Sequence, residues 1–541
     1  MKFLILFLIV ILAFLLRFYQ LSTNPPGLNL DEVAIGYNAY SILRTGRDEY
    51  GKFLPIVFRS HDDYKPPLYI YLTAPSIAVF GVNEFAVRFP AALFGTLSVL
   101  AVFFLSRQLF SSSKLALLSS YFLAISPWHL QFTRAAFETG VTVFATAVGV
   151  FLFLRGLTKK SSASLILASL AFGLELYLYQ AAKVFIPLLV IALLALNLQK
   201  IINQKKRVLV FVFIFATFFL PVAFLSTTRA GQLRFQGTSI FKEYLPYAHA
   251  QSWREADQLS GSTFAASLFH PRFLTYLPSV ISGYLSHYDL TFLFVGDHGP
   301  PNNYVPGAVG LLYPWEILAV IPGLYFLARR FRPASLVVFA WFLLAPLPAS
   351  VTSGVPSATR TALSLPIYQI ITALAIVVLL NIIRNHSRFW ANASSLAFLL
   401  LTVPIVTYYL HMMFFHAPRD YSDIWFYGYK NVVAETARLA PNYRRVVVST
   451  ALKQPQNFFA FFLRYDPLTY LRVDGGTVSG GFKENRNHFA KFNFTSSDWE
   501  TLLKEKSLLF VGLVDDFPDS ITPIKTFHYL NGKPSVMIVG T

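Results

Sequence analysis

The stretch FLILFLIVILAFLLRFYQLSTNPPGLNLDE, residues 3–32, decides how the rest of the chain is interpreted. Residues 3–19 form an apolar run of about the length that crosses the hydrocarbon core of a bilayer. Arg17 interrupts its end and no small-residue cleavage site follows, which is typical of an uncleaved anchor. The acidic pair Asp31-Glu32 comes shortly afterwards. The stretch therefore predicts a membrane anchor followed by two carboxylates close to the membrane surface.

The composition places the chain among integral membrane proteins. Hydrophobic residues make up 55% of its 541 residues and charged residues 13%, whereas soluble domains carry about 25% charged residues. The absence of cysteine excludes disulfides, thiolate catalysis and cysteine zinc sites. Much of the net charge of +18 lies in short loops between apolar runs. We therefore attribute this charge to membrane topology and expect a lipid bilayer, not a nucleic acid, as partner.

Apolar runs recur along most of the chain and predict about eleven transmembrane helices. A shorter apolar piece at residues 66–80 opens with two prolines and suits a re-entrant or surface helix. The runs that follow residues 3–19 lie at 84–106, 115–131, 136–155, 162–179, 183–199, 208–226, 309–328, 334–350, 361–383 and 391–412.

Lys and Arg gather in alternate loops between these runs. The positive-inside rule places such loops in the cytoplasm, together with the N-terminus. The cationic loops are 107–114, 155–160, 200–207, 329–332 and 384–388. The segments expected on the extracytoplasmic side are 20–83, 127–135, 227–308, 351–360 and everything after 412.

The composition also divides the chain into two parts. Residues 1–412 are predicted to form a transmembrane domain, and residues 413–541 a small extracytoplasmic α/β domain in which helical patterns alternate with strand-like runs. Asn531-Gly532 is a hairpin turn signal in this second part. The loop 227–308 is rich in aromatic residues, His, Gly and Pro, has little clear period, and is expected to cover a site. The fold class is therefore a polytopic α-helical membrane protein with juxtamembrane helices and a small α/β domain.

The acidic pair opens a predicted amphipathic helix, Asp31–Arg44, which is expected to lie along the membrane interface with Tyr37 on its apolar surface. One interpretation of the pair is an N-terminal cap favoured by the helix dipole. The other is chemical. Glycosyl transfer from a polyprenyl phosphate needs a base for the proton of the acceptor hydroxyl and cations for the departing phosphate. Asp31 is then the base, Glu32 orients the acceptor or partner groups, and Tyr37 is a candidate substrate contact.

Two external cations are candidates for binding the phosphate. Lys65 stands directly before Pro66-Pro67, which places its ammonium at headgroup depth, although a snorkelling lysine would have the same position. Arg360 ends the external loop 351–360 and begins the tenth span. An arginine buried near a helix end in a membrane is costly, and its planar guanidinium suits a phosphate.

Arg134 and Glu138 stand four residues apart and are expected to share one helix face. They form either a simple ion pair or a second acidic site with Arg134 as a substrate contact. His287 is another candidate contact, in a polar group of the large loop. That group, His287, Asp289, Asp297 and His298, matches no sharp metal-binding spacing. We therefore expect no metal or other cofactor.

These residues resemble the dolichyl-phosphate-mannose-protein mannosyltransferases, glycosyltransferase family 39, and their bacterial relatives, which belong to the GT-C superfamily. The resemblance covers roughly residues 1–412, most strongly 1–140, and follows a pattern more than a rigid signature. The matching stretches are the anchor span, Asp31-Glu32, Lys65–Tyr69, Asn83–Pro90, Ser286–Gly307 and Leu344–Arg360.

The resemblance implies roles for individual residues. Asp31 matches the family's acidic residue that is taken as base, with Glu32 as its neighbour, and Glu138 stands where another acidic residue is found. Lys65 matches the lysine that lies by the lipid phosphate in the aminoarabinose transferase branch. That branch has an acidic residue just before this lysine, where this chain has Tyr64. The difference argues against a metal and against lipid A modification.

Two functions from different classes follow. The first is an inverting hexosyl- or pentosyltransferase that takes a sugar from a polyprenyl-phosphate donor. Its acceptor is a protein, a lipid or a glycan. The second is a transporter or flippase of lipid-linked saccharides, with charged residues along a path. The chain shows neither a clear internal repeat nor clear rows of charges inside its spans, so the enzyme is favoured.

Overall fold

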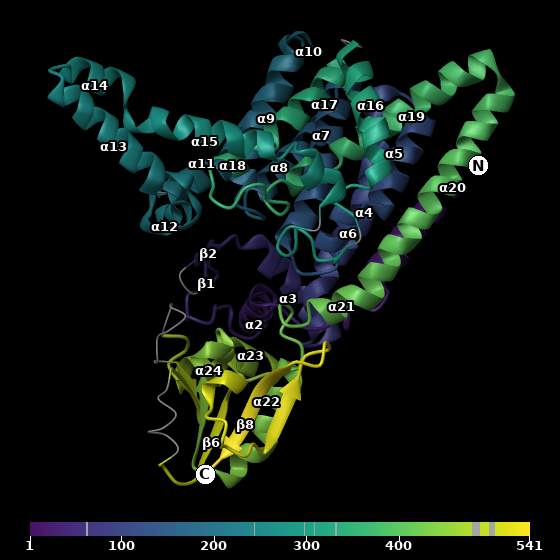
Figure 1. Ribbon diagram of the computed structural model, residues 1–541. Coiled ribbons are helices and arrows are strands. Elements are labelled where there is room, and N and C mark those ends of the chain that lie inside the picture. Colours follow the sequence, from purple (N-terminus) through teal and green to yellow (C-terminus); the bar gives the residue numbers. More distant parts are fainter. Residues whose placement is uncertain are drawn as a thin grey trace.

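The computed structural model describes residues 1–60, 63–242, 244–296, 298–307, 309–329, 333–478, 487–496 and 504–541. Figure 1 shows a body of packed helices with an arm of helices projecting from one side and a β-sheet below it. Asp297, which the sequence grouped with His287, lies outside the described residues, as do Arg330 and Arg332 of one cationic loop.

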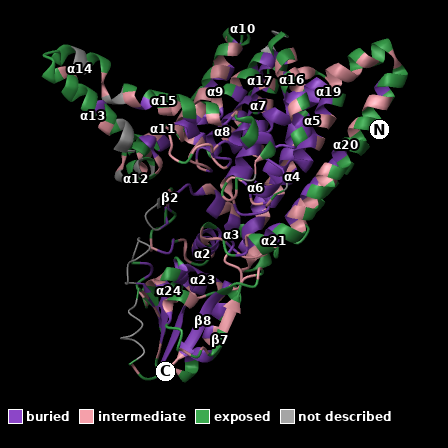
Figure 2. Ribbon diagram, viewed as in Figure 1, coloured by how far each residue is buried: buried purple, intermediate pink, exposed green. Residues whose placement is uncertain are grey.

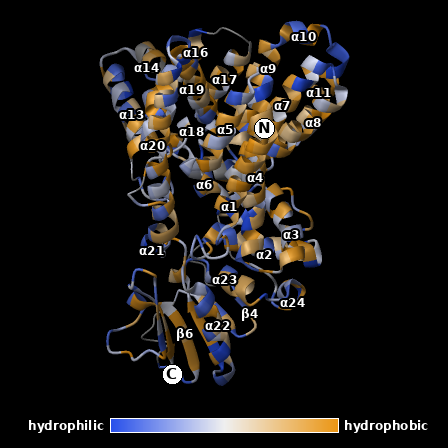
Figure 3. Ribbon diagram, turned by 90° about the vertical axis from the view of Figure 1, so that its right-hand side faces the viewer, coloured by the Kyte–Doolittle hydropathy of each residue, from blue (hydrophilic) through white to orange (hydrophobic). Residues whose placement is uncertain are grey.

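The helical body contains the predicted apolar runs, and Figure 3 shows that its helices are mostly hydrophobic. In the described part of the chain, five helices are long and apolar enough to cross a membrane. These five are Glu84–Phe110, Glu138–Lys159, Lys205–Thr227, Ala362–His386 and Arg388–Asp420. The total of about eleven spans stays a prediction. Other helices of the body are α1 (Lys2–Phe18), α5 (Ser113–Ile125), α8 (Ser162–Glu175), α9 (Ala182–Leu196), α10 (Leu198–Ile202), α16 (Ile317–Arg329) and α17 (Pro333–Leu344).

One predicted span is not a single helix. The run 115–131 breaks after Ile125, where α5 ends, and a second helix, α6 (Pro127–Thr133), begins. Ser126 separates the two helices with an extended backbone, and its side chain accepts a hydrogen bond from the backbone of His129. A proline at the first helical position suits the start of α6. The break directs the chain toward α7 (Glu138–Lys159), whose first residue belongs to the site described below.

Helix α2 (Leu30–Thr45) forms as expected, but protein covers most of it. Its N-terminus is closed by a capping box between Asn29 and Glu32, and it ends at Gly46 with a φ of 69°. Residues 32–39 are all buried (Figure 2). The amphipathic pattern therefore did not reveal that protein covers most of the helix, and its position along the membrane interface stays a prediction. The helix packs between α3 (Leu68–Phe80) and α23 (Pro455–Phe462).

The C-terminal region contains a six-stranded sheet in the order β4-β5-β3-β6-β8-β7. Strand β3 (Arg445–Ser449) pairs in parallel with β5 (Phe492–Thr495) and β6 (Leu508–Leu513). The other pairs, which involve β4 (His488–Phe489), β7 (Lys525–His528) and β8 (Pro534–Gly540), are antiparallel. Gly532 lies in the β7–β8 connection with a φ of 85°, as its turn signal predicted. Helices α22 (Tyr429–Leu439), α23 and α24 (Pro467–Arg472) accompany the sheet.

The sheet region and the first external segment share one hydrophobic core. Tyr37 of α2 packs edge-on against Tyr470 of α24 with ring centroids 5.6 Å apart. A Cβ on Gly36 would lie 2.5 Å from the ring of Phe461. Glu49 accepts hydrogen bonds from Asn38 and, at 2.7 Å, from Thr477. Because these contacts resemble the interior of a domain, the C-terminal region is a support for α2 and not a freely attached module.

The projecting arm occupies much of the predicted covering loop. It consists of α12 (Arg229–Thr238), α13 (Tyr244–Leu259), α14 (Thr263–Phe269) and α15 (Arg272–Ser286), and the expectation that this segment covers a site stays a prediction. In Figure 1, α13 and α14 extend away from the body while α15 returns to it. The arm therefore brings residues 286–307 back beside the helical body.

Candidate active site

The two neighbouring carboxylates at the start of α2 have different surroundings. Glu32 is fully buried and accepts hydrogen bonds from Arg88 at 2.8 Å and 3.1 Å. It also accepts from the backbone nitrogen of Ala136 at 2.9 Å and of Asn29 at 3.1 Å. Arg88, on α4 (Glu84–Phe110), binds backbone carbonyls of Leu21, Pro25 and Gly27 as well. Glu32 thus holds the segment before α2 against α4 and α7.

Asp31, in contrast, is largely open to solvent. Its side chain is 61% exposed, and its Oδ1 lies 2.7 Å from Nζ of Lys65. A short antiparallel hairpin of β1 (Phe58–Ser60) and β2 (Asp63–Lys65) places Lys65, with Phe58 as its cross-strand partner. The lysine is 9% exposed. The hairpin therefore presents one mostly buried cation to one accessible carboxylate.

Electrostatics favour the charged form of Lys65. Burial is the largest single effect and lowers its pKa, but the nearby Asp31 and Glu138 carboxylates and the hydrogen bond to Asp31 raise it. The net result is a pKa above the ordinary lysine value. Lys65 is therefore an ammonium at every physiological pH.

Three more side chains complete what we call the Asp31 cluster, which consists of Asp31, Lys65, Glu138, Tyr179 and Arg360. Glu138 is the first residue of α7 and interacts electrostatically with Lys65. Tyr179 interacts electrostatically with both Glu138 and Arg360. The turn that carries Tyr179 is joined to the Lys65 strand, because Gln180 donates a hydrogen bond to the carbonyl of Tyr64.

Arg360 lies in the loop between α18 (Leu347–Ser350) and α19 (Ile367–His386). Its guanidinium donates to Oγ1 of Thr352 at 2.7 Å and to the carbonyl of Ser353. Among the described residues it forms no ion pair with a carboxylate. A half-buried guanidinium that has only neutral partners retains the ability to bind an anion.

His287 is close to this loop and connects it to α15 through hydrogen bonds. One ring nitrogen bonds the carbonyl of Gly283 at 2.7 Å, and the other accepts from the backbone of Ser357 at 3.1 Å. Burial is the main reason that the pKa of His287 falls to about 4, and Arg360 lowers it further. The neutral imidazole therefore holds the Arg360 loop against α15, and its hydrogen bonds leave little capacity for a substrate.

Two other predicted contacts lie outside the cluster. Arg134 follows the end of α6, whereas Glu138 begins α7, so the shared helix face predicted for this pair is wrong. The guanidinium of Arg134 donates to four backbone carbonyls at the end of α1 and in the segment after it: those of Leu16, Arg17, Tyr19 and Asn24. The side chain of Tyr37 is 1% exposed and donates a long hydrogen bond to the carbonyl of Tyr465. Both residues contribute to packing.

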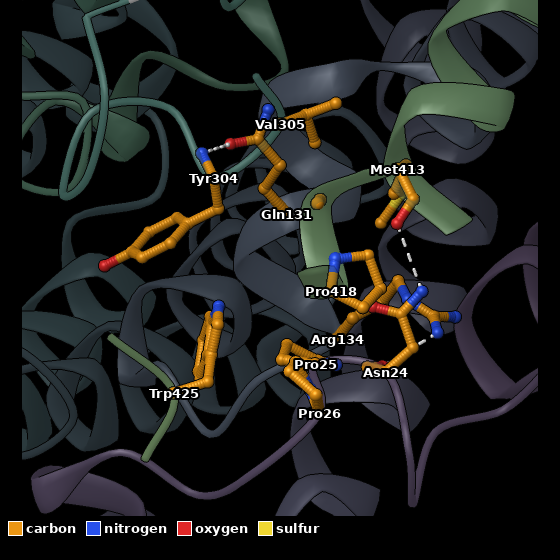
Figure 4. Close-up of a pocket in the computed structure, with 11 residues that line it drawn as sticks. Asn24, Pro25, Pro26, Gln131, Arg134, Tyr304, Val305, Met413, Pro418 and Trp425 are labelled. Carbon is orange, nitrogen blue, oxygen red and sulfur yellow. Dashed lines mark hydrogen bonds between the residues drawn. The ribbon is translucent and has the colours of Figure 1, made fainter. Parts of the chain in front are cut away.

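An aromatic cluster stands next to the Asp31 cluster. Tyr304 packs against Trp425 with ring centroids 5.2 Å apart and against Phe137 at 5.7 Å. Trp425 in turn lies under the guanidinium of Arg88 at 5.8 Å. Behind these rings is a small cavity of about 20 Å³, roughly the space of one water molecule (Figure 4).

A second, open hollow follows α15. One part of about 760 Å³ is lined mainly by apolar side chains such as Leu277, Ile281 and Leu285. The adjoining part of about 540 Å³ shares Pro278 and Ser282 with it and reaches Thr352 and Ser353, the partners of Arg360. A groove that is apolar along α15 and more polar near Thr352 and Ser353 therefore leads to the loop that carries the guanidinium of Arg360.

The described residues offer no group of three or more His, Asp or Glu that could hold a metal ion. The expectation of a reaction without metal or cofactor stays a prediction. Sequence reasoning did not single out Arg88, Tyr179 or Tyr304. Arg88 had a usable signal, because an arginine near the start of an apolar helix is costly unless it is paired. Tyr179 and Tyr304 had none, since each is brought to the cluster by contacts between distant segments.

Part of the chain matches a known protein family. Residues 64–224 match the family model described as dolichyl-phosphate-mannose-protein mannosyltransferase. An uncharacterized protein of Aquifex aeolicus is 28% identical over 165 residues, which are 30% of this chain and 32% of that protein.

Solved membrane proteins share the fold at low sequence identity. ArnT from Cupriavidus metallidurans, bound to undecaprenyl phosphate, has a TM-score of 0.50 at 15% identity, covering 98% of this chain and 97% of that chain. The oligosaccharyltransferase AglB from Archaeoglobus fulgidus, with an inhibitory peptide and a dolichol-phosphate, has a TM-score of 0.53 at 13% identity. It covers 85% of this chain, which spans 63% of AglB. The chain therefore shares the fold of ArnT and AglB, and its residues 64–224 are similar to the dolichyl-phosphate-mannose-protein mannosyltransferase family.

Proposed function

We propose that the protein is an inverting glycosyltransferase that moves a sugar from a polyprenyl-phosphate donor to an acceptor hydroxyl on the extracytoplasmic face of the membrane. The observation that carries the proposal is the contact of 2.7 Å between Asp31 and Lys65, which places a carboxylate beside an ammonium. The named family of the matching segment and the lipid phosphates in the ArnT and AglB structures support the donor class.

In the proposed reaction Asp31 is the general base. The acceptor hydroxyl gives its proton to the Asp31 carboxylate, and its oxygen attacks the anomeric carbon of the donor. The bond from this carbon to the phosphate oxygen breaks, and its electron pair stays on the phosphate. Because a phosphate is a good leaving group, cations suffice to stabilise it and no general acid is required. A single displacement inverts the configuration of the anomeric carbon.

Lys65 connects donor binding to the availability of the base. In the unliganded protein its ammonium is engaged by Asp31. A lipid phosphate that binds Lys65 competes for this ammonium and releases the carboxylate for the acceptor. We therefore propose that the donor binds first and that Asp31 becomes an effective base only afterwards.

The remaining cluster residues take supporting roles in this proposal. Arg360 binds the phosphate at the end of the groove that follows α15. The part of this groove lined by Leu277, Ile281 and Leu285 receives the apolar chain of the donor. Glu138 balances the charge of Lys65 and orients it. Glu32, tied to Arg88 and the backbone of Ala136, positions Asp31 and does not touch the substrate.

We further propose that the N-terminus is cytoplasmic and that residues 413–541 form an extracytoplasmic domain, as the alternate cationic loops predict. This topology puts the Asp31 cluster and the sheet region on the same side of the membrane. It also agrees with the shared core of α2, α23 and α24, which requires these helices to lie on one side.

The test is sugar transfer by the purified full-length protein in lipid nanodiscs. The protein is incubated with a panel of radiolabelled polyprenyl phosphohexoses and phosphopentoses, each with glycoside, peptide and lipid acceptors, and label that leaves the donor is counted. We expect Asp31→Asn to lower turnover by about 10²- to 10⁴-fold while donor binding remains. Wild-type turnover in D31N would contradict the assignment of the base.

The same preparation distinguishes the flippase. Reconstituted into liposomes, a flippase moves the labelled donor lipid from one leaflet to the other with its sugar still attached. Translocation at a constant sugar-to-lipid ratio, with no transfer to any acceptor, would replace the enzyme by the transporter.

A further inference from the structure

We propose that Tyr304 binds the acceptor, and that the acceptor is a carbohydrate whose ring lies against the phenol while one of its hydroxyls faces Asp31. The inference rests on the proposed transferase function and adds the substrate class to it. It is carried by the position of Tyr304, by the rigid support behind its ring, and by the hydroxyl that the support leaves free.

The position of Tyr304 is the first step. The ring belongs to the connection between α15 and α16, yet its phenol interacts electrostatically with Asp31 and Glu32 at the start of α2. Tyr304 is half-buried, so part of its surface remains accessible. Figure 4 shows that its ring points away from the side chain of Gln131, and the residue lines the small cavity. The Tyr304 ring contacts Trp425, which lies under Arg88, and Arg88 pairs with Glu32, so these contacts connect Tyr304 to the acidic pair.

The support behind the ring is the second step. The backbone nitrogen of Tyr304 donates to Oε1 of Gln131 at 2.9 Å, and the rings of Trp425 and Phe137 pack against the phenol. Trp425 is 3% exposed and lies between Arg88 and Gly27. A Cβ added to Gly27 would lie 2.1 Å from the carbonyl oxygen of Trp425. Arg88 also binds Glu32, so one arginine fixes both the aromatic support and the acidic pair.

The free hydroxyl is the third step. Within the described part of the chain, the phenol oxygen of Tyr304 has no hydrogen-bond partner. By comparison, the hydroxyl of the buried Tyr313 donates to the carbonyl of Ile125, and that of Tyr409 to the carbonyl of Pro127. A phenol that is half-buried and lacks a partner is suited to bond a ligand, because buried polar groups are otherwise satisfied by the protein.

The chemistry of the site selects the ligand class. A pyranose has an apolar C–H face that packs on an aromatic ring, and several hydroxyls that bond neutral donors and acceptors. Tyr304 offers the ring and one such hydroxyl, and Asp31 accepts the proton of the attacking hydroxyl. A serine or threonine side chain presents no ring-sized apolar face, so it would gain little from Tyr304.

The experiment measures acceptor kinetics at saturating donor with alkyl glycosides and with short Ser- and Thr-containing peptides. We expect Tyr304→Phe to raise the KM for glycosides about fivefold, as expected for one neutral hydrogen bond. Tyr304→Ala should lower kcat/KM for glycosides about fiftyfold, because it removes the ring contact as well. The KM for the donor should stay within about twofold of wild type, since a nearly unchanged value indicates that the donor site is intact.

Tyr325 supplies the matched control. It is an exposed tyrosine on α16, where its ring lies beside Arg329, and Tyr325→Phe and Tyr325→Ala should leave glycoside kinetics unchanged. A melting temperature for each variant separates loss of binding from loss of folding, and Y304F retains the ring if Y304A does not fold.

Binding gives a second readout that does not require turnover. Saturation-transfer NMR of octyl glucoside, octyl mannoside and octyl arabinoside with protein in nanodiscs should show contact for wild type and much less for Y304A. If wild type transfers no sugar but this difference in binding remains, the transferase proposal fails and the sugar site stands. Equal binding by wild type and Y304A, an unchanged glycoside KM in Y304A, or a clear preference for peptides would overturn the inference.

Discussion

Asp31 and Glu32 are neighbours in sequence, yet their ion pairs differ in almost every physical respect. The Glu32–Arg88 pair is completely buried, and each partner has additional backbone hydrogen bonds. The Asp31–Lys65 pair joins a buried lysine to a carboxylate that is 61% exposed. A fully bonded buried pair is costly to separate, whereas an exposed carboxylate can exchange its partner. The Glu32–Arg88 pair therefore stabilises the site, whereas the Asp31–Lys65 pair is able to react.

The largest expected effect comes from breaking the buried pair. Arg88→Ala leaves the carboxylate of Glu32 buried without its cation and removes the guanidinium from Trp425. We expect a loss of about 3–5 kcal/mol of folding free energy. Thermal unfolding and yield in detergent measure it, with Arg329→Ala, which removes an arginine beside an exposed tyrosine, as the control. An R88A protein as stable as wild type would show that the Glu32–Arg88 pair does not stabilise the fold.

The next effect concerns the exchangeable pair. Lys65→Ala removes the ammonium from Asp31 and with it a phosphate ligand, so we expect donor affinity to fall about 10- to 100-fold, as for loss of a charge-assisted contact. The free energy of unfolding should change far less than in R88A. Donor binding measured by scintillation proximity, together with a melting curve, tests both expectations. If K65A binds donor normally, the lysine has no role toward the phosphate.

A smaller effect is expected from pH, through the neutral imidazole of His287, which bonds the Arg360 loop. Burial lowers the pKa of His287 to about 4, below its value in the unfolded chain, so the unfolded state binds more protons between these two values. Stability is therefore complete above about pH 6.5 and declines as pH falls toward 4. Between pH 7 and pH 5.5 we expect a loss of about 1 kcal/mol.

The variant His287→Gln isolates this contribution. Glutamine has no proton to gain in this range, so the difference in melting temperature between wild type and H287Q should shrink as the pH is lowered from 7 to 5.5. A difference that stays constant over this range would show that His287 is not the group that titrates.

The smallest effect tests a residue that the structure assigns to packing. The hydroxyl of Tyr37 makes one hydrogen bond of 3.4 Å to the carbonyl of Tyr465. Tyr37→Phe keeps the ring between α2 and α24, so we expect a change in stability of about 0.5 kcal/mol or less and unchanged transfer. A large loss of activity in Y37F would return Tyr37 to the list of substrate contacts.

Sequence reasoning predicted the residues of the Asp31 cluster better than their surroundings. Asp31, Lys65, Glu138 and Arg360 were all selected, because charged side chains are rare beside apolar spans and are costly there. Arg134 was selected with Glu138, His287 from a polar group of the large loop, and Tyr37 from the helix that follows Asp31, but the structure shows that they bond the backbone or pack. A charge or a hydroxyl next to a span does not reveal in which direction its side chain points.

The sequence by itself determined that the chain crosses a membrane, where its apolar runs lie, and that acidic and basic groups follow the first span, because these properties depend on local composition. Tertiary structure alone decided which of two adjacent carboxylates is buried and which is accessible. The difference arises because Arg88 and the backbone of Ala136 surround Glu32, while the side chain of Asp31, which the hairpin carrying Lys65 reaches, stays 61% exposed. Contacts between segments so far apart in sequence leave no pattern within any one of them.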